Sequence, residues 1–244
     1  MRVAAGRAAA TMLVIAMVML TGACEPQPVG PPSVTSTRPR CPFDDGIVIY
    51  GGDSLVTQWP RWVPLPPELT PYNTARGGSA YTGNLTPDPD YGTIGSRILD
   101  DLDDCGNDVG AVVISGGHVD LSYGRSAEAV IESIGELDEA LHARGVEAVF
   151  LEITPVSNAA DWYTVHQVAR QTINAWMATP GNLHGAVVDC SPVLETTPAS
   201  DVLAPRYWNF IDAFGTIDLV HPNDAAYEAI GTCVQPAILA AVER

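Results

Sequence analysis

Four short runs of apolar residues constrain the fold of this chain more than any other feature of its sequence. The runs are GIVIY at 46–50, VGAVVIS at 109–115, VEAVFLEIT at 146–154 and GAVVDCS at 185–191. They are rich in β-branched residues, and glycine, proline or polar residues bound them. Continuous apolar runs of this length are typical of strands that are buried on both faces of a parallel sheet.

Helical patterns lie between and after these runs. In 126–144 and 161–177, apolar residues recur at spacings of three and four, and 223–242 provides a further pattern. Gly145 follows the first pattern, at a place where glycine commonly ends a helix. Strands that alternate with helices predict an α/β fold with a mostly parallel sheet and right-handed crossovers. The chain has no internal repeat, so one folded domain over 41–244 is expected.

The first 40 residues differ in composition from the rest. Two arginines precede the apolar stretch 8–20, which is short for a membrane span and ends in small residues, so 1–23 is predicted to be a signal peptide. The segment Leu20-Thr-Gly-Ala-Cys24 resembles the lipobox of bacterial lipoproteins, which makes Cys24 a candidate for lipidation; the alternative is an ordinary secretory signal. Residues 24–40 contain five prolines and predict an extended tether.

Charge and export together limit the partners of the chain. Its 244 residues carry a formal net charge of -17, which repels phosphate backbones, so nucleic acid is not an expected partner. We expect a monomer that touches a membrane only through the N-terminal lipid. The predicted location is the outer face of the cell membrane, or the medium if Cys24 is not lipidated.

Five cysteines fit this layout. If Cys24 carries the lipid, Cys41, Cys105, Cys190 and Cys233 remain, and an even number in an exported chain favours two disulfides. Three pairings are possible. The order along the chain favours Cys41–Cys105 and Cys190–Cys233. The spacings fit no common zinc pattern, so metal binding is the weaker interpretation and no metal site is predicted.

Three unusual segments fall where a parallel α/β sheet binds its ligands, beyond the carboxyl ends of its strands. GGDS at 51–54 follows the first apolar run, and GGHVD at 116–120 follows the second. DLVHPN at 218–223 lies in a predicted loop before the last helix. A turn with a helix-capping serine would explain Ser54 alone, but it would not explain why all three segments converge.

The three segments contain the groups that a serine nucleophile needs. A serine hydroxyl requires a base within hydrogen-bond reach, and the base requires a third group that holds its tautomer. Asp218 and His221 are three residues apart, so the carboxylate can face Nδ1 of the imidazole and leave Nε2 free for Ser54. On its own, His221 would be interpreted as an exposed loop histidine.

Together these residues resemble a known family. The segment Gly52-Asp53-Ser54-Leu55 near the start of the domain, with Asp218-x-x-His221-Pro near its end, is similar to the SGNH (GDSL) hydrolases in order and spacing. The resemblance implies a flavodoxin-like, three-layer α/β/α sandwich over 41–244. It also implies Ser54 as nucleophile, His221 as general base and acid, and Asp218 as the group that orients His221.

The resemblance also implies an oxyanion hole with three donors. The first is the N–H of Ser54 and the second is a glycine N–H from the segment NTARGGSAYTG at 73–83. Gly78 is the best match for that glycine, with Gly77 or Ala80 as alternatives. The third donor is an asparagine side chain in the family.

This sequence departs from the family at the third donor. The segment ISGGHVDL puts His118 where asparagine is expected. A neutral imidazole N–H can donate to an oxyanion, so His118 is predicted to complete the hole, the alternative being that it only packs or caps a turn. Asp120 is interpreted as a helix cap or as a partner of His118. Loss of one oxyanion donor costs about 100- to 1000-fold in rate.

Three functions are compatible with these residues. The first is a serine esterase, a bacterial exported lipoprotein that cleaves a small-molecule or glycan ester through an acyl-enzyme and needs no cofactor. The second is a catalytically weak SGNH domain that binds a cell-envelope glycan or another partner, which the histidine at position 118 keeps open. The third is an O-acyltransferase that acts on a sugar. Trp59 and Trp62 follow the nucleophile and either line a pocket or pack in the core.

Overall fold

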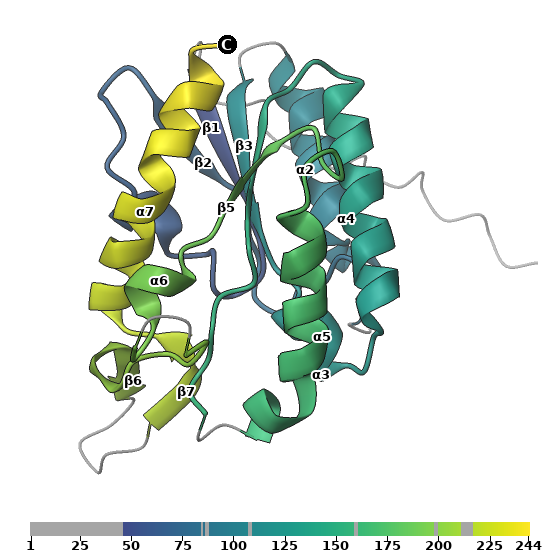
Figure 1. Ribbon diagram of the computed structural model, residues 1–244. Helices are drawn as coiled ribbons and strands as arrows, with labels where there is room; N and C mark the ends of the chain where they lie inside the picture. Colours follow the sequence, from purple (N-terminus) through teal and green to yellow (C-terminus); the bar gives the residue numbers. More distant parts are fainter. Residues whose placement is uncertain are drawn as a thin grey trace, which may run out of the picture. The chain divides into compact units, whose positions relative to one another are not determined.

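The computed structural model describes residues 46–83, 85, 88–106, 109–158, 161–197, 200–210 and 217–244. Helices and strands alternate along most of this part of the chain (Figure 1). The elements are β1 (Ile47–Gly52), α1 (Trp59–Trp62), β2 (Thr70–Asn73), η1 (Pro89–Tyr91), α2 (Ile94–Cys105), β3 (Val109–Ser115), α3 (His118–Ser122), α4 (Ala127–His142), β4 (Ala148–Leu151), α5 (Asp161–Met177), β5 (Ala186–Val188), α6 (Ser191–Leu194), η3 (Pro205–Tyr207), β6 (Trp208–Phe210), β7 (Ile217–Pro222) and α7 (Asp224–Val242).

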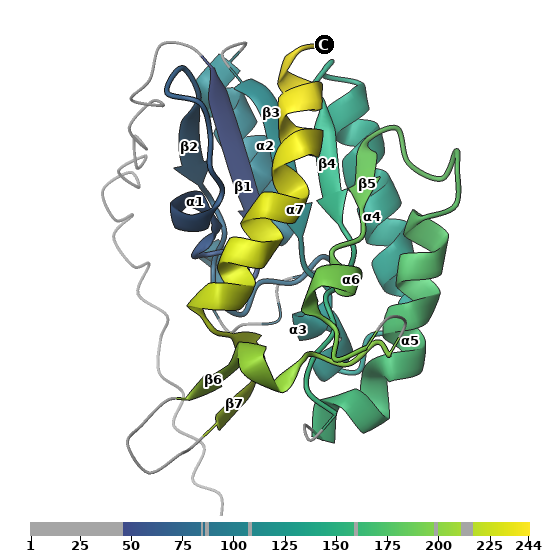
Figure 2. The same ribbon diagram turned by 60° about the vertical axis from the view of Figure 1, so that its left-hand side comes forward.

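Five strands form one sheet in the order β2-β1-β3-β4-β5, and every pair in it is parallel. The order reverses between β1 and β3, which is the place where doubly wound sheets bind ligands. Helices cover both faces of the sheet: α7 lies on one face, and α2, α4 and α5 lie on the other (Figure 2). The predicted three-layer α/β/α fold with a parallel sheet is confirmed.

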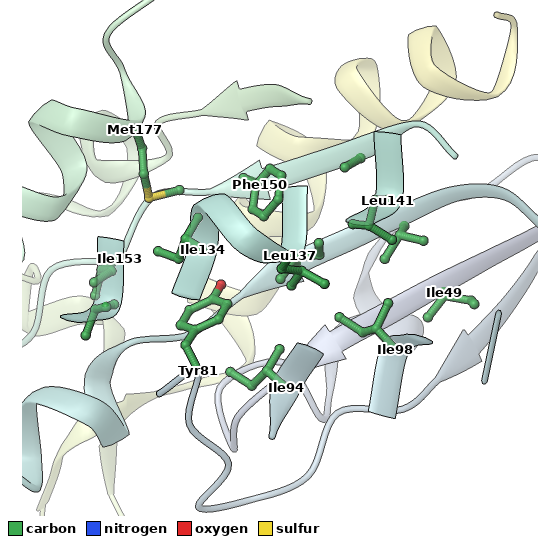
Figure 3. Close-up of a cluster of buried hydrophobic side chains, with 14 of the residues drawn as sticks. Ile49, Tyr81, Ile94, Ile98, Ile134, Leu137, Leu141, Phe150, Ile153 and Met177 are labelled. Atoms are coloured by element: carbon green, nitrogen blue, oxygen red, sulfur yellow. The ribbon is translucent and has the colours of Figure 1, made fainter. Parts of the chain in front are cut away.

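Alternate residues of the strands supply two separate cores. Ile47, Ile49 and Phe150 point to the side of α2 and α4, where they pack with Ile98 and Leu137 (Figure 3). The residues between them point to the other side. There Val48, Tyr50, Val113, Val149 and Leu151 pack against Ile230, Val234 and Ile238 of α7. Both faces of each central strand are therefore apolar, which explains why these strands read as continuous apolar runs.

Helix α7 is the longest helix of the described chain and is apolar enough to cross a membrane by length and composition. Its buried side chains nevertheless pack against β3, β4 and β5, as expected for a core helix of a doubly wound fold. A disulfide joins Cys233 in α7 to Cys190, which follows β5.

The sequence patterns missed several elements. Strand β2 contains Pro71 and lies at the edge of the sheet, where a proline is tolerated. Helix α2 carries an aspartate, Asp101, and an arginine, Arg97, among its buried residues, which weakens its apolar pattern. The prediction that Asp218 and His221 lie in a loop is wrong. Both residues lie on β7, which pairs with β6 in an antiparallel ribbon.

The predictions for the N-terminus fall on residues that the structure does not describe. They are the signal peptide over 1–23, the tether over 24–40, lipidation of Cys24 and the pairing of Cys41 with Cys105. Cys105 itself lies within the described chain, at the end of α2, and is disulfide-bonded.

Candidate active site

Ser54 lies at the carboxyl end of β1, at the switch point of the sheet. The chain leaves the strand through Gly51 and Gly52, and neither position has room for a side chain. A β-carbon on Gly52 would collide with the carbonyl oxygen of Ser115 at the end of β3. The two glycines therefore allow β1 to pass close to its neighbours before the chain turns at Ser54.

The turn itself is held by short-range hydrogen bonds. Oδ1 of Asp53 accepts the N–H of Leu55 at 2.9 Å, and the hydroxyl of Thr57 donates to the carbonyl of Ser54 at 2.8 Å. Asp53 is 1% exposed, and its Oδ2 has no hydrogen-bond partner among the described residues. Burial raises the pKa of Asp53 to about 7. This buried carboxyl directly precedes the candidate nucleophile.

Ser54, His221 and Asp218 form one hydrogen-bonded chain. Oγ of Ser54 lies 2.7 Å from Nε2 of His221, and Nδ1 of the same ring lies 2.7 Å from Oδ2 of Asp218. A carboxylate only accepts hydrogen bonds, so Nδ1 carries the ring proton of the neutral imidazole and Nε2 is free to accept the proton of Ser54. The structure thus brings together the three residues that the sequence singled out.

The spacing of Asp218 and His221 explains how one short segment supplies both groups. Oδ1 of Asp218 accepts the N–H groups of Val220 and His221, each at 2.9 Å, and this leaves Oδ2 for the ring. Burial alone would raise the pKa of Asp218, but these N–H groups and the imidazole together lower it. Asp218 is therefore a carboxylate at neutral pH.

Asn223 fixes the end of the strand that carries these groups. Its side-chain oxygen accepts the N–H of Ala226 and so caps α7. Its side-chain nitrogen donates to the carbonyl oxygens of Arg206 and Trp208, at 2.8 Å and 3.1 Å. Strand β7, β6 and the start of α7 are thereby tied together two residues after His221. No pattern in the sequence indicated this role of Asn223.

Of the two candidate glycines, Gly77 lies nearer to Ser54, and Gly78 stays a candidate for the oxyanion donor. A β-carbon placed on Gly77 would lie 3.6 Å from Cβ of Ser54, whereas one on Gly78 would approach only the hydroxyl of Tyr91 within 4 Å. Among the described residues, no main-chain group accepts the N–H of Ser54, Gly77 or Gly78. Ala80 is fully buried, and its carbonyl accepts the N–H of Ile94.

His118 does not complete an oxyanion hole in this structure, which corrects our expectation for it. Its Nε2 lies 3.0 Å from the carbonyl oxygen of Thr154, and a carbonyl only accepts, so Nε2 carries a proton that is already donated. Burial and then the charge of Arg170 lower the pKa of His118 to about 3, so the ring is neutral and has no second N–H. The side chain links the loop after β3 to the loop after β4.

Asp120 neither caps a helix nor holds His118. It is fully buried, and its two oxygens accept the N–H groups of Tyr81 and Thr82 at 3.0 Å and 2.9 Å. It therefore links α3 to the loop that contains Gly77.

Two further features bear on what the site binds. Trp59 is 1% exposed and belongs to the core on the α7 side, so it packs rather than lines a pocket. In the part of the chain that the structure describes, no group of three or more His, Cys, Asp or Glu side chains is arranged to hold a metal ion.

Comparisons by sequence and by structure differ for this chain. No model of a known protein family matches it, and no curated protein matches it in sequence. Solved structures do resemble it. A GDSL-like lipase from Bacteroides thetaiotaomicron has a TM-score of 0.59 at 16% sequence identity, and the alignment covers 80% of this chain and 88% of the lipase.

Two other solved structures extend the likeness. The native aryl esterase of M. smegmatis has a TM-score of 0.58 at 13% identity, with 80% of this chain and 99% of the esterase aligned. A carbohydrate esterase family 3 protein from Talaromyces cellulolyticus has a TM-score of 0.51 at 16% identity, with 81% and 98% aligned. At these identities, the likeness establishes a shared fold.

Proposed function

We propose that this protein is a serine esterase that hydrolyses a carboxylic ester through an acyl-enzyme. The observation that carries the proposal is the hydrogen-bonded chain from Ser54 through His221 to Asp218, at the switch point of the sheet. The fold shared with a lipase, an aryl esterase and a carbohydrate esterase supports the same reaction class. It does not choose among their substrates.

In the first half of the reaction, Oγ of Ser54 attacks the ester carbonyl carbon while its proton moves to Nε2 of His221. The carboxylate of Asp218 stabilises the imidazolium that forms. Negative charge develops on the carbonyl oxygen, and we propose that it is received by the N–H of Ser54 and by an N–H of the adjacent segment that contains Gly77 and Gly78. The bond to the alcohol then breaks, and His221 returns its proton to the alcohol oxygen.

In the second half, water attacks the acyl group on Ser54. His221 takes a proton from this water, and Ser54 regains a proton when the carboxylic acid leaves. Ser54 and His221 thus return to the protonation states that they had before the reaction. Because His118 already donates to Thr154, we propose that the developing charge is stabilised by main-chain N–H groups alone, which predicts a slower enzyme than one with a third donor.

The test is labelling with a fluorophosphonate probe, together with turnover of aryl esters of graded chain length and of acetylated sugars. Wild type and a Ser133→Ala control, which changes a serine of α4, should be labelled and active. Ser54→Ala should lose both signals. Equal labelling of wild type and Ser54→Ala would reject Ser54 as the nucleophile.

The same samples test the alternative of a binding domain. Folded wild type that is neither labelled nor active would reject the esterase and favour binding of a cell-envelope glycan. Transfer of the acyl group to an added sugar, in place of water, would identify an acyltransferase. We further propose that the protein is exported and held at the outer face of the cell membrane through Cys24.

A further inference from the structure

The N–H groups of Gly77 and Gly78 lie in a tight turn over residues 76–79. The N–H of Ser79 donates to the carbonyl of Arg76 at 3.1 Å, and Gly78 has a φ of +79°. A positive φ at the third residue fits a type II turn, which favours glycine there. The turn packs against the nucleophile loop because the N–H of Arg76 donates to the carbonyl of Gly52 at 3.0 Å.

A buried arginine from another element reaches this turn. Arg97 lies on α2 and is 6% exposed. Its Nη1 donates to Oγ of Ser79 at 2.6 Å and its Nη2 donates to the carbonyl of Gly52 at 3.3 Å. The same guanidinium therefore contacts the loop two residues before Ser54 and the chain two residues after Gly77.

Arg97 also contacts the chain on both sides of this turn, at Thr74 before it and at Tyr91 after it. Nε donates to the carbonyl of Thr74 at 3.1 Å, and Nη1 also approaches the carbonyl of Tyr91 at 3.3 Å. The ring of Tyr91 in turn lies 4.0 Å beneath the guanidinium of Arg76, the first residue of the turn. One planar guanidinium thus donates to acceptors on four residues.

A lysine could not replace this arrangement. An ammonium group is a compact point charge, whereas these acceptors are spread around a flat fork that donates in fixed directions. Ser79 is 1% exposed, so water cannot replace the guanidinium as the hydrogen-bond partner of its hydroxyl. The geometry selects arginine at position 97.

We propose that Arg97 is a positioning residue for the reaction: it holds the Gly77–Gly78 turn at the separation from Ser54 at which its N–H groups receive the developing oxyanion. The proposal rests on the esterase function proposed above. Because the oxyanion exists only near the transition state, displacement of the turn should lower kcat and leave KM nearly unchanged.

The test compares two buried arginines. Arg97→Lys should lower kcat by roughly 10- to 100-fold, less than the about 100- to 1000-fold lost with a whole oxyanion donor, because the donor is displaced and not removed. KM should change by less than about threefold. Arg170→Lys is the matched control, because Arg170 is also fully buried and bonded to the carbonyl of Ile153, but contacts neither the turn nor Ser54. It should lower the melting temperature and keep kcat.

A milder variant covers the case in which Arg97→Lys does not fold. Ser79→Ala keeps the arginine and removes only the acceptor of Nη1 in the turn. It should lower kcat by roughly 3- to 10-fold, a fraction of the loss expected for a missing donor. If Arg97→Lys and Ser79→Ala both fold and keep the wild-type kcat, Arg97 is structural only and the proposal fails.

Hydrogen exchange gives a readout that does not depend on activity. The amide of Ser79 is hydrogen-bonded within the turn and that of Arg76 to the carbonyl of Gly52, so Arg97→Lys should speed exchange over residues 74–80 and not in α5. Unchanged exchange there would overturn the proposal. Wild type that is inert toward every ester would instead reject the proposed function, while the exchange data would still decide whether Arg97 holds the turn.

Discussion

Two segments flank the candidate active site in this protein, and they use their polar groups in opposite ways. The loop after β2, residues 74–82, keeps the N–H groups of Gly77 and Gly78 free of main-chain partners and fixes its flanks through the buried residues Arg97 and Asp120. The segment after β3, residues 116–122, which includes α3, donates the Nε2 proton of His118 to Thr154. A group that already donates cannot serve an oxyanion.

The position of a residue in a motif therefore does not determine its role. His118 stands where an oxyanion donor was expected, yet its only proton stabilises a neighbouring loop. The first loop has Gly77 beside Ser54, followed by Gly78. Neither has a side chain, so only their main-chain N–H groups are available as donors. The esterase proposed here therefore depends on how firmly the first loop is held.

The largest effect is expected from Asp120, which holds that loop. Asp120→Asn replaces one acceptor of the Tyr81 and Thr82 N–H groups with an NH₂ group, and should lower the free energy of unfolding by about 3 kcal/mol. It should also lower kcat by roughly tenfold or more, because the loop that carries Gly77 loosens. Denaturant unfolding and ester turnover measure the two effects.

The protein offers a matched control at the other end of the sheet. Asp138 is 2% exposed and accepts the N–H groups of His184 and Gly185. Asp138→Asn should lose similar stability and keep kcat. If both variants lost kcat equally, general destabilisation would explain the rates, and the special role of the first loop would be withdrawn.

An intermediate effect is expected from His118. His118→Ala removes the hydrogen bond to Thr154 and leaves a small cavity, so the free energy of unfolding should fall by about 2 kcal/mol at pH 8. The kcat of the folded variant should stay within about twofold of wild type, because the ring donates away from the reaction. A tenfold loss of kcat in folded His118→Ala would return His118 to the mechanism.

The pH dependence of stability provides a second readout at His118. Its pKa in the folded protein, about 3, lies below the ordinary value of 6.5, so the unfolded chain binds a proton that the folded chain does not. The free energy of unfolding that this difference in pKa contributes is fully present above pH 6.5 and is lost as the pH falls toward 3. Between pH 8 and pH 5, wild type should lose about 2 kcal/mol that His118→Ala does not lose. Equal losses in the two proteins would show that His118 titrates normally.

The smallest effect is expected from the turn glycine itself. Gly78 has a φ of +79°, so Gly78→Ala should cost about 1 kcal/mol of stability. Gly145, with a φ of +68°, provides the control, because Gly145→Ala carries a similar strain at a distance from Ser54. Only Gly78→Ala should also lower kcat, by roughly threefold. Equal kcat in the two variants would show that the reaction tolerates movement of the turn.

Much of the fold was predictable because it depends on residues that are close in sequence. Strands β1, β3, β4 and β5 are apolar on both faces, and α4, α5 and α7 carry regular apolar patterns. Strand β2 and helix α2 were missed because Pro71 and the buried charges of α2 interrupt those patterns. Arg97 is one of these buried charges, and it occupies a position of α2 at which an apolar residue would continue the helical pattern. This position was the only sign of its role in the sequence.

At the candidate site, Ser54, Asp218 and His221 could be singled out from the sequence, and the structure brings them together. The last two are three residues apart, so the hydrogen bonds of Asp218 to the following N–H groups place its carboxylate at the imidazole with little help from elsewhere. The position of Gly77 beside Ser54 and the hydrogen bond from His118 to Thr154 could not be predicted from the sequence. Those outcomes depend on partners that lie tens of residues away along the chain, and the direction of a donor follows from the acceptor that it meets.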